Sequence, residues 1–204
     1  MITLSAKIHL GESRTLEIDK NTLTSLSGKI FDRERIDLPN WGIISNDGKL
    51  GFYDSNFEVL NMIENGTLNT NSKAELFINN TLSNKTVKIG DYVTRDWNYD
   101  NDNRVVNISL QDDLIEWQDI AFGAWNMERS KTFKYVYDLL KKTTPQKWNI
   151  VADSSTEDFL SSVAVSTFYF EKGSLWAQWE KFCNAAMLHI YKDNKGDVIV
   201  KHGI

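Results

Sequence analysis

The hydrophobic periodicity of the chain changes near Asp112, and this change constrains the fold more than any other feature of its 204 residues. Before that point, apolar residues recur mostly at every second position, as in half-buried β-strands. After it, they recur at intervals of three and four, as on one face of an α-helix. The sequence therefore predicts an α+β protein with a β-rich first domain, 1–111, and an α+β second domain, 112–204. No linker rich in Pro, Gly or Ser separates the two.

The β-rich part begins with a regular alternation of apolar and polar residues over 2–10, followed by a turn and a short apolar alternation over 16–18. This pattern predicts an opening hairpin. Three further strands are expected at 74–79, 85–99 and 104–110. The long one should bend near Gly90, and the polar residues 100–103 should form the turn to the last one. The expected architecture is antiparallel and barrel-like.

Two local signals are expected to interrupt these strands. The tripeptide Asn46-Asp47-Gly48 lies between two apolar runs and predicts a hairpin with a type I′ turn, because such turns need positive φ. Ser55 followed by Glu58 fits a capping box. Asn65-Gly66 is typical of a left-handed helix end. We therefore expect a short helix, embedded among the strands, between these last two signals.

Helical spacing dominates the second part of the chain. The apolar residues of 133–142 recur at i, i+3, i+4 and i+7, which predicts an amphipathic helix that Pro145 ends. A second helix is expected over 174–187, and a hairpin over 188–201 should follow it. Residues 146–172 show no regular pattern. The second part is therefore predicted to be a helix–helix–β-hairpin unit.

Composition excludes several classes of function. The formal charge of −5 argues against a general nucleic-acid binder, which would carry a basic stripe. The single cysteine, Cys183, allows no disulfide within the chain. No run approaches 18 apolar residues, and the first residues lack the features of a signal peptide. We therefore expect neither a nucleic-acid partner nor a membrane span.

No group of residues in the sequence points to catalysis. The glycine-rich nucleophile, dinucleotide and phosphate motifs are absent. His9, His189 and His202 lack the spacing of a helical zinc site. Cys183 lies on the apolar stripe of a predicted helix, where a thiol is buried rather than activated. The sequence therefore predicts no enzyme, no catalytic residue, no bound cofactor and no metal ligand.

Acidic residues form two patterns that we interpret structurally. Asp96–Asp102 places oxygen ligands at alternate positions, like the first half of an EF-hand loop. Positions six and twelve are however Asn101 and Asn107, so a hairpin turn is the preferred interpretation. The pairs Asp112-Asp113 and Glu157-Asp158 suit loops or helix starts, where the helix dipole favours acids. They give no support to a glycosidase pair.

The tryptophans leave the most open question, since the chain has 7 of them and 7 tyrosines. Trp176 and Trp179 lie on the core stripe of the helix expected at 174–187. Trp97, Trp125 and Trp148 have less regular surroundings. Three interpretations stay open for these last three: core residues, anchors of a protein interface, and a platform for sugars.

Three segments resemble tail hub proteins of bacteriophages and prophages. They are 96–114, the run 50–54 with the helix and Gly66 that follow it, and 174–183 with the hairpin after it. In those hubs, helices and a β-hairpin follow a β-barrel domain, and the order of segments matches over most of the chain. The resemblance implies a structural protein of the tail tip or baseplate. It would fold in the bacterial cytoplasm and reside in the tail of the virion.

The resemblance also implies what such a protein contacts. A hub assembles with the tail tube, with distal tail proteins and with neighbouring hubs, and homotrimers are the expected state in the particle. Hubs carry a second barrel after the hairpin, and whether one follows Ile204 is open in the sequence. Two other functions stay open: a carbohydrate- or receptor-binding module of a phage tail, suggested by the aromatic residues, and a hydrolase, for which no motif is present.

Overall fold

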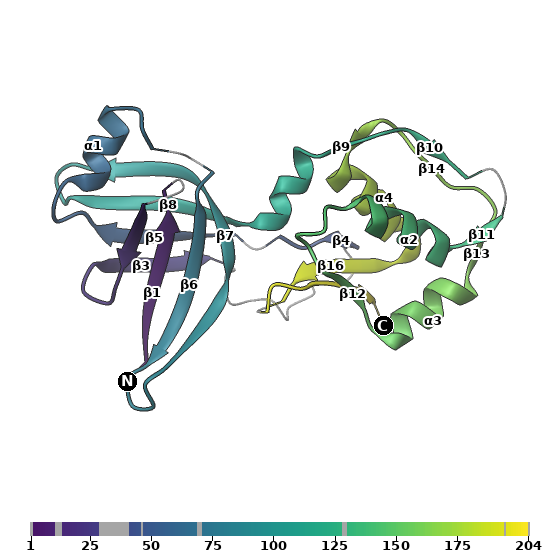
Figure 1. The fold of residues 1–204 in the computed structure, drawn as a ribbon, viewed down its shortest axis with the longest axis horizontal. Helices are drawn as coiled ribbons and strands as arrows, with labels where there is room; N and C mark the ends of the chain where they lie inside the picture. Colours follow the sequence, from purple (N-terminus) through teal and green to yellow (C-terminus); the bar gives the residue numbers. More distant parts are fainter. Residues whose placement is uncertain are drawn as a thin grey trace. The chain divides into compact units, whose positions relative to one another are not determined.

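The computed structural model describes residues 2–10, 14–28, 41–45, 47–68, 71–127, 130–193 and 195–203. The chain divides into two compact units (Figure 1). The first contains residues 1–33 and 46–113, and the second contains 34–45 and 114–204. The fold class is confirmed as α+β, with a large antiparallel sheet and several short helices. The division into independent domains at 111/112 stays a prediction.

One antiparallel sheet forms the first unit. Its strands are β1 (Ile2–His9), β2 (Thr15–Ile18), β3 (Leu23–Gly28), β5 (Asp47–Tyr53), β6 (Lys73–Asn80), β7 (Lys85–Asp100) and β8 (Val105–Asp112), in the spatial order β2-β1-β6-β7-β8-β5-β3. The edge strands β2 and β3 are joined by a tight turn, in which the Leu23 N–H donates to the Asp19 carbonyl at 2.8 Å. The two edge strands are consecutive in sequence, so the sheet must curl to bring its edges toward each other. No closed barrel is detected among the described strands.

Alternation along these strands builds the core of the first unit, as the sequence predicts. On β1, Ala6 and Ile8 are buried, whereas Lys7 between them is exposed. The other strands contribute the same way, and the buried residues include Ile18, Leu50, Phe52, Ala74, Leu76, Tyr92, Val106, Ile108 and Leu110. The register of β6 and β7 shifts beside Gly90, where the long strand was expected to bend. Such a bulge increases the local twist and helps the sheet to curl.

The embedded helix α1 (Glu58–Glu64) forms where expected, but its N-terminal cap differs from the prediction. The Asp54 carboxylate accepts hydrogen bonds from the backbone N–H groups of Glu58, Val59 and Leu60. The prediction of a capping box formed by Ser55 and Glu58 is therefore wrong. The expected left-handed end is confirmed, since Gly66 has φ +62°.

The hairpin expected around Asn46-Asp47-Gly48 is also wrong. Asp47 and Gly48 lie inside β5, opposite Gln111 and Leu110 of β8. The preceding residues form β4 (Gly42–Ile43), which pairs in parallel with a strand of the second unit. Sequence alone could not place β4 there, because its partner lies near the other end of the chain. Asn46 itself is outside the described residues.

The second unit combines helices with a four-stranded mixed sheet. The helices are η2 (Asp113–Gln118, a 3-10 helix), α2 (Phe133–Thr143), α3 (Ser154–Ser162) and α4 (Leu175–Ala186). The strands β12 (Ile150–Ala152), β17 (Val198–His202), β16 (Leu188–Lys192) and β4 lie in that order. The predicted helices and closing hairpin are confirmed. Helix α3 and strand β12 are additional, so the expectation of irregular structure over 146–172 is wrong.

A long, interrupted ribbon accompanies the helices of this unit. Its pieces pair β9 (Ala121–Phe122) with β15 (Gly173–Ser174), β10 (Trp125–Asn126) with β14 (Tyr169–Phe170), and β11 (Lys131–Thr132) with β13 (Ala164–Val165), all antiparallel. One register holds from the Ala121–Ser174 pair to the Asn126–Tyr169 pair, and it slips by one residue at Lys131–Val165. The three short pairs therefore behave as a single two-stranded ribbon.

Aromatic residues fill the core of the second unit. Trp117 stacks on Trp179 at a centroid separation of 5.8 Å and meets Trp148 edge to face at 5.9 Å. The predicted apolar stripe of α2 is buried at Phe133, Val136, Tyr137 and Leu140. On α4, Trp179 and Cys183 are buried as expected. Within the described part of the chain, no helix is long and apolar enough to cross a bilayer.

Candidate assembly and binding surfaces

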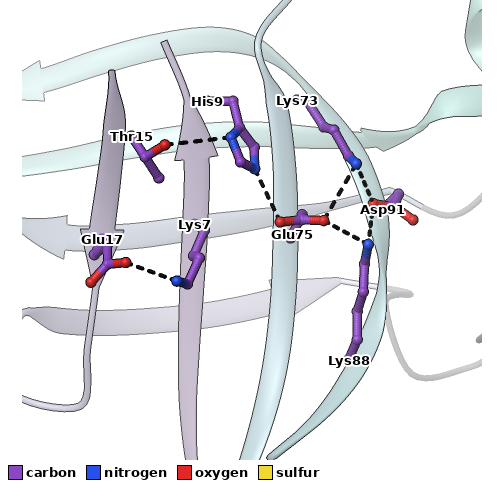
Figure 2. A network of polar contacts seen from close by, with 8 residues as sticks. All are labelled: Lys7, His9, Thr15, Glu17, Lys73, Glu75, Lys88 and Asp91. Atoms are coloured by element: carbon purple, nitrogen blue, oxygen red, sulfur yellow. Dashed lines mark hydrogen bonds and ion pairs between the residues drawn. The ribbon is translucent and has the colours of Figure 1, made fainter. Parts of the chain in front are cut away.

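A network of charged side chains covers the outward face of strands β1, β2, β6 and β7 (Figure 2). Figure 2 shows eight residues, which are Lys7, His9, Thr15, Glu17, Lys73, Glu75, Lys88 and Asp91. Glu75 is central: its carboxylate contacts Lys88 Nζ at 2.6 Å, His9 Nε2 at 3.0 Å and Lys73 Nζ at 3.3 Å. Lys88 also contacts Asp91 at 2.6 Å. Three lysines face three carboxylates, so this face is polar but close to neutral.

Partial burial makes the centre of the network electrostatically strong. Burial alone would raise the pKa of Glu75, but hydrogen bonds from Lys88 and His9 and the charges of the two lysines outweigh it and lower the pKa to about 2. Burial would likewise lower the pKa of Lys88, and hydrogen bonds to Asp91 and Glu75 raise it instead. Both groups are therefore held in their charged forms.

The network brings together a hydroxyl, an imidazole and a carboxylate. Thr15 Oγ1 lies 3.4 Å from His9 Nδ1, whose other ring nitrogen contacts Glu75. A catalytic triad has this order of groups, but it also needs a site for the developing oxyanion and a cleft for substrate. Here the groups lie on the outward face of a sheet, and Glu75 is bound by two lysines. The arrangement links β1, β2 and β6 on this face of the sheet. No local pattern in the sequence indicates it, because Glu75 is 66 residues away from His9.

An apolar arm extends from the same sheet beyond its core. We use the term arm for the first residues of β1 together with the β6–β7 hairpin, which run side by side toward the N-terminus in Figure 1. Leu4, Ile78 and Val87 form one cross-strand row on its inner face. Val87 is 57% exposed, and Leu82 in the hairpin turn is 89% exposed. This end of the sheet thus presents apolar side chains that no described residue buries.

The arm also has two open strand edges. β1 pairs with β2 only from Ala6 onward, and β7 pairs with β8 only from Tyr92 onward. Among the described strands, nothing pairs with the outer edges of 2–5 and 85–91. The edge at 2–5 carries neither a charge nor a proline. An unprotected edge of this kind is a template for pairing with another chain.

Aromatic residues gather on the surface of the second unit. We use the term aromatic surface for Trp125, Asn126, Tyr135 and Tyr169 with the lysines Lys131 and Lys181. Trp125 lies 6.2 Å from Tyr135 and 5.6 Å from the buried Phe170, between ring centroids. A hollow of about 430 Å³ is lined by Ala124, Trp125, Asn126, Tyr169 and Phe170.

Only one of the three undecided tryptophans reaches this surface. Trp125 lines the hollow. Trp148 is 5% exposed within the aromatic core of the second unit, and Trp97 packs against the core of the first. The structure therefore places Trp97 and Trp148 in cores, and the interface and sugar interpretations stay open for Trp125. No sequence signal singled out Tyr135 or Tyr169, which come from α2 and from the ribbon.

The acidic patterns lie in strands, in a turn and at helix starts. Of the run 96–102, residues 96–100 belong to β7, and the turn begins at 101. The Asp100 carboxylate accepts hydrogen bonds from the backbone of Asp102 and Asn103 and from the Asn103 side chain, and these bonds lower its pKa. Glu157 lies in the first turn of α3. Asp112 ends β8, and Asp113 begins η2. Within the described residues, no cluster of His, Cys, Asp and Glu has the arrangement of a metal site.

The three histidines and the cysteine lie in separate surroundings and do not form a common site. His9 belongs to the charged network, and His202 stacks on Phe159 at 3.6 Å between centroids. His189 is fully buried beside Trp41, at 4.8 Å between centroids, and neither ring nitrogen has a hydrogen-bond partner within the described part of the chain. Burial lowers the pKa of His189. Burial, with a smaller contribution from Glu180, raises the pKa of the Cys183 thiol, so this cysteine is unreactive.

Solved structures share this fold over almost the whole chain. A prophage tail protein, gp18, from Listeria monocytogenes EGD-e aligns with 98% of this chain and 50% of its own, with TM-score 0.56 and 8% identity. The 43 kDa tail protein of prophage MuSo2 from Shewanella oneidensis aligns with 98% of this chain and 55% of its own, with TM-score 0.54 and 10% identity. The chain has the fold of prophage tail proteins.

A third neighbour is the tail protein from Neisseria meningitidis MC58, with TM-score 0.53, 12% identity, 98% of this chain and 50% of that one. At such identities the likeness is one of fold. This chain spans about half the length of these three tail proteins. No protein-family model matches the sequence, and the search of curated proteins finds no match either.

Proposed function

We propose that the chain is a structural component of a phage or prophage tail, acting at the tail tip or baseplate as a hub-like assembly protein. The observation that carries the proposal is the shared fold: both units together, 98% of the chain, align with three tail proteins, two of which are prophage proteins. In this proposal the chain resides in the tail of the virion, works without catalysis, and contacts tube, distal tail or neighbouring hub proteins. A homotrimer is its proposed state in the particle.

The arm is the surface best suited to assembly. It combines exposed apolar side chains with strand edges that are open among the described residues. Pairing at an edge adds backbone hydrogen bonds, and the apolar row on the inner face adds buried area. Because the two open edges lie on opposite sides of the arm, one copy offers β1 where the next offers β7. Such a head-to-tail contact generates a ring when the rotation closes.

The proposal is tested in particles produced by the bacterium that carries the gene. We expect mass spectrometry to find the chain in purified tails, at a fixed ratio to the tube protein. Val87→Asp and Leu82→Asp, at exposed positions of the arm, should leave the isolated protein folded but reduce its incorporation by about tenfold, since each places a charge in an apolar contact. Tyr53→Asp, an exposed position outside the arm, is the matched control and should incorporate normally.

Two results would contradict the proposal at different levels. Absence of the chain from purified tails would reject a role in the virion. Normal incorporation of both arm variants would keep the tail role and reject the arm as the contact.

A further inference from the structure

We propose that the aromatic surface of the second unit is a binding site for an acidic saccharide. The inference does not depend on assembly, because all its residues belong to the ribbon, α2 and α4 of the second unit. Its first basis is shape. The hollow of about 430 Å³ has the size of small-molecule sites, and its lining is mostly apolar.

The second basis is the mixture of ring faces with a free amide. Tyr169 is 54% exposed and Tyr135 is 47% exposed, so each offers a ring to solvent. Asn126 lies directly opposite Tyr169 in the ribbon, and cross-strand partners project to the same face. Its exposed amide makes no hydrogen bond to another described residue. A sugar ring presents C–H groups to an aromatic face and hydroxyls to an amide that both donates and accepts.

The third basis is charge. Lys181 Nζ lies 3.6 Å from the centroid of Tyr169, and Lys131 Nζ lies 5.4 Å from that of Tyr135. Within the described part of the chain, neither ammonium group forms an ion pair, although other lysines of the second unit do. Each cation is held beside an exposed ring by a cation–π contact. Along the ribbon, Asn126 and Tyr169 project to one face, whereas Trp125 and Phe170 project to the other, where Tyr135 contacts Trp125. A ligand that stacks on Tyr169 therefore meets the Lys181 ammonium group, which forms no ion pair with a described carboxylate, and a uronic acid supplies the matching charge.

The same features favour a saccharide over an acidic peptide. A peptide segment binds most tightly where a side chain fills an enclosed pocket. This hollow is open, and flat rings with a single amide line it. Stacking on an open ring face suits a sugar ring, and the Lys181 ammonium group beside Tyr169 suits the carboxylate of an acidic sugar.

The test is calorimetric titration of the full chain with trigalacturonate, with uronate trisaccharides of other stereochemistry, and with neutral maltotriose. We expect at least one acidic trisaccharide to bind about tenfold more tightly than maltotriose, a difference of about 1.4 kcal/mol. Tyr169→Ala should weaken binding of both classes about tenfold. Lys181→Gln should remove the preference for the acid and leave the neutral sugar unaffected, whereas Lys131→Gln, beside Tyr135 on the other face of the ribbon, should keep the preference.

Matched controls separate the site from general effects. Tyr53→Ala removes an exposed tyrosine of the first unit, and Lys141→Gln removes an exposed lysine of α2 beside the buried ring of Tyr137. Both should bind like the wild type. In a ¹H–¹⁵N spectrum, the Trp125 indole signal can be assigned because Trp125→Phe removes it. In the wild type, this signal should shift when the saccharide is added.

Three outcomes would overturn the inference. The first is that no acidic trisaccharide gives a heat of binding. The second is that Tyr53→Ala loses as much affinity as Tyr169→Ala. The third is that hexaglutamate binds at least as tightly as any saccharide. The last would assign the surface to an acidic protein segment. None of these outcomes bears on the presence of the chain in tails, so the two proposals fail separately.

Discussion

Glu75 shows how single residues stabilise the outward face of the first unit. Its carboxylate contacts side chains from three strands, namely His9 on β1, Lys73 on its own strand β6, and Lys88 on β7. The side chain is only 17% exposed, so solvent screens these contacts less than it screens the pair between Lys7 and Glu17. Glu75 thus connects neighbouring strands through side chains in addition to the backbone ladder.

The first prediction concerns the pH dependence of this network. The folded-state pKa of Glu75 is about 2, below its ordinary value of 4.5, so the folded chain binds fewer protons than the unfolded chain between these values. The contribution of Glu75 is therefore fully present above about pH 5 and is lost as the pH falls toward 2. Glu75→Gln should lower the free energy of unfolding in urea by about 1–3 kcal/mol near pH 7.

The difference between wild type and Glu75→Gln should shrink as the pH falls through this window. Glu17→Gln is the matched control, because Glu17 is 68% exposed and its pair with Lys7 is solvated. It should change the unfolding free energy by less than about 0.5 kcal/mol. A pH-independent difference for Glu75→Gln would show that packing, not charge, accounts for its effect.

A second residue-scale prediction concerns Gly203. A Cβ atom added there would collide with the ring of Trp41 and would lie 3.1 Å from His189 Nε2. Gly203→Ala should therefore displace Trp41 and expose His189, at a cost of about 1–3 kcal/mol in urea unfolding. Gly123→Ala is the control, since a Cβ atom there meets nothing within 4 Å. Equal stability of both variants would contradict the close packing of Trp41.

At the scale of elements, α1 depends on a cap outside its own sequence. The third prediction is that Asp54→Ala lowers the unfolding free energy by about 1–2 kcal/mol, because three backbone N–H groups lose their acceptor. Ser55→Ala should cost less than about 0.5 kcal/mol, since Ser55 caps nothing in the structure. Thermal unfolding of both variants measures the difference. If Ser55→Ala lowered the stability more than Asp54→Ala does, the capping box predicted from the sequence would be supported instead.

Sequence predicts those elements whose signal is local. The alternation over β1 and the helical spacing of α2 and α4 each required only one face of one element to be apolar. Helix α3 was missed because its sequence is rich in serine, and Leu160 is its only buried apolar residue. The signal that could have found it is the Asp153 cap, whose carboxylate accepts from the Thr156 N–H.

The missed contacts are those that join distant segments. Asp47-Gly48 has a turn sequence, yet pairing with β8 holds it in a strand, so tertiary structure overrides the local preference. The aromatic surface likewise combines Trp125, Tyr135 and Tyr169 from three elements. Their number could be counted in the sequence, but their proximity depends on the register of the ribbon and on the packing of α2.

At the scale of the whole molecule, the sheet of the second unit takes one strand from the first half of the chain. Strand β4 pairs with β16, and the Ile44 N–H donates to the Ile190 carbonyl at 2.7 Å. The fourth prediction is that a fragment 114–204 folds but is less stable than the same unit in the full chain. A synthetic peptide of 34–45 should raise its melting temperature as the peptide concentration rises.

The matched control is the same peptide with Trp41→Ala and Ile43→Asp, which removes the ring beside His189 and the apolar residue in the strand. It should leave the melting temperature unchanged. A fragment as stable as the unit in the full chain would show that β4 contributes little. Failure of the fragment to fold at any peptide concentration would contradict the two-domain division that we propose.

The position of β4 has a consequence for the order of events on the ribosome. Most of the chain is translated between β4 and its partner, because β16 lies in the last hairpin. The first sheet can close while β4 still has no partner strand. The second sheet is completed only when the final strands leave the exit tunnel and reach an early segment. A nascent chain released before that hairpin would therefore keep Trp41 uncovered and the edge of β4 open. Premature termination should therefore yield a product that aggregates and is sensitive to proteases, rather than a shorter functional protein.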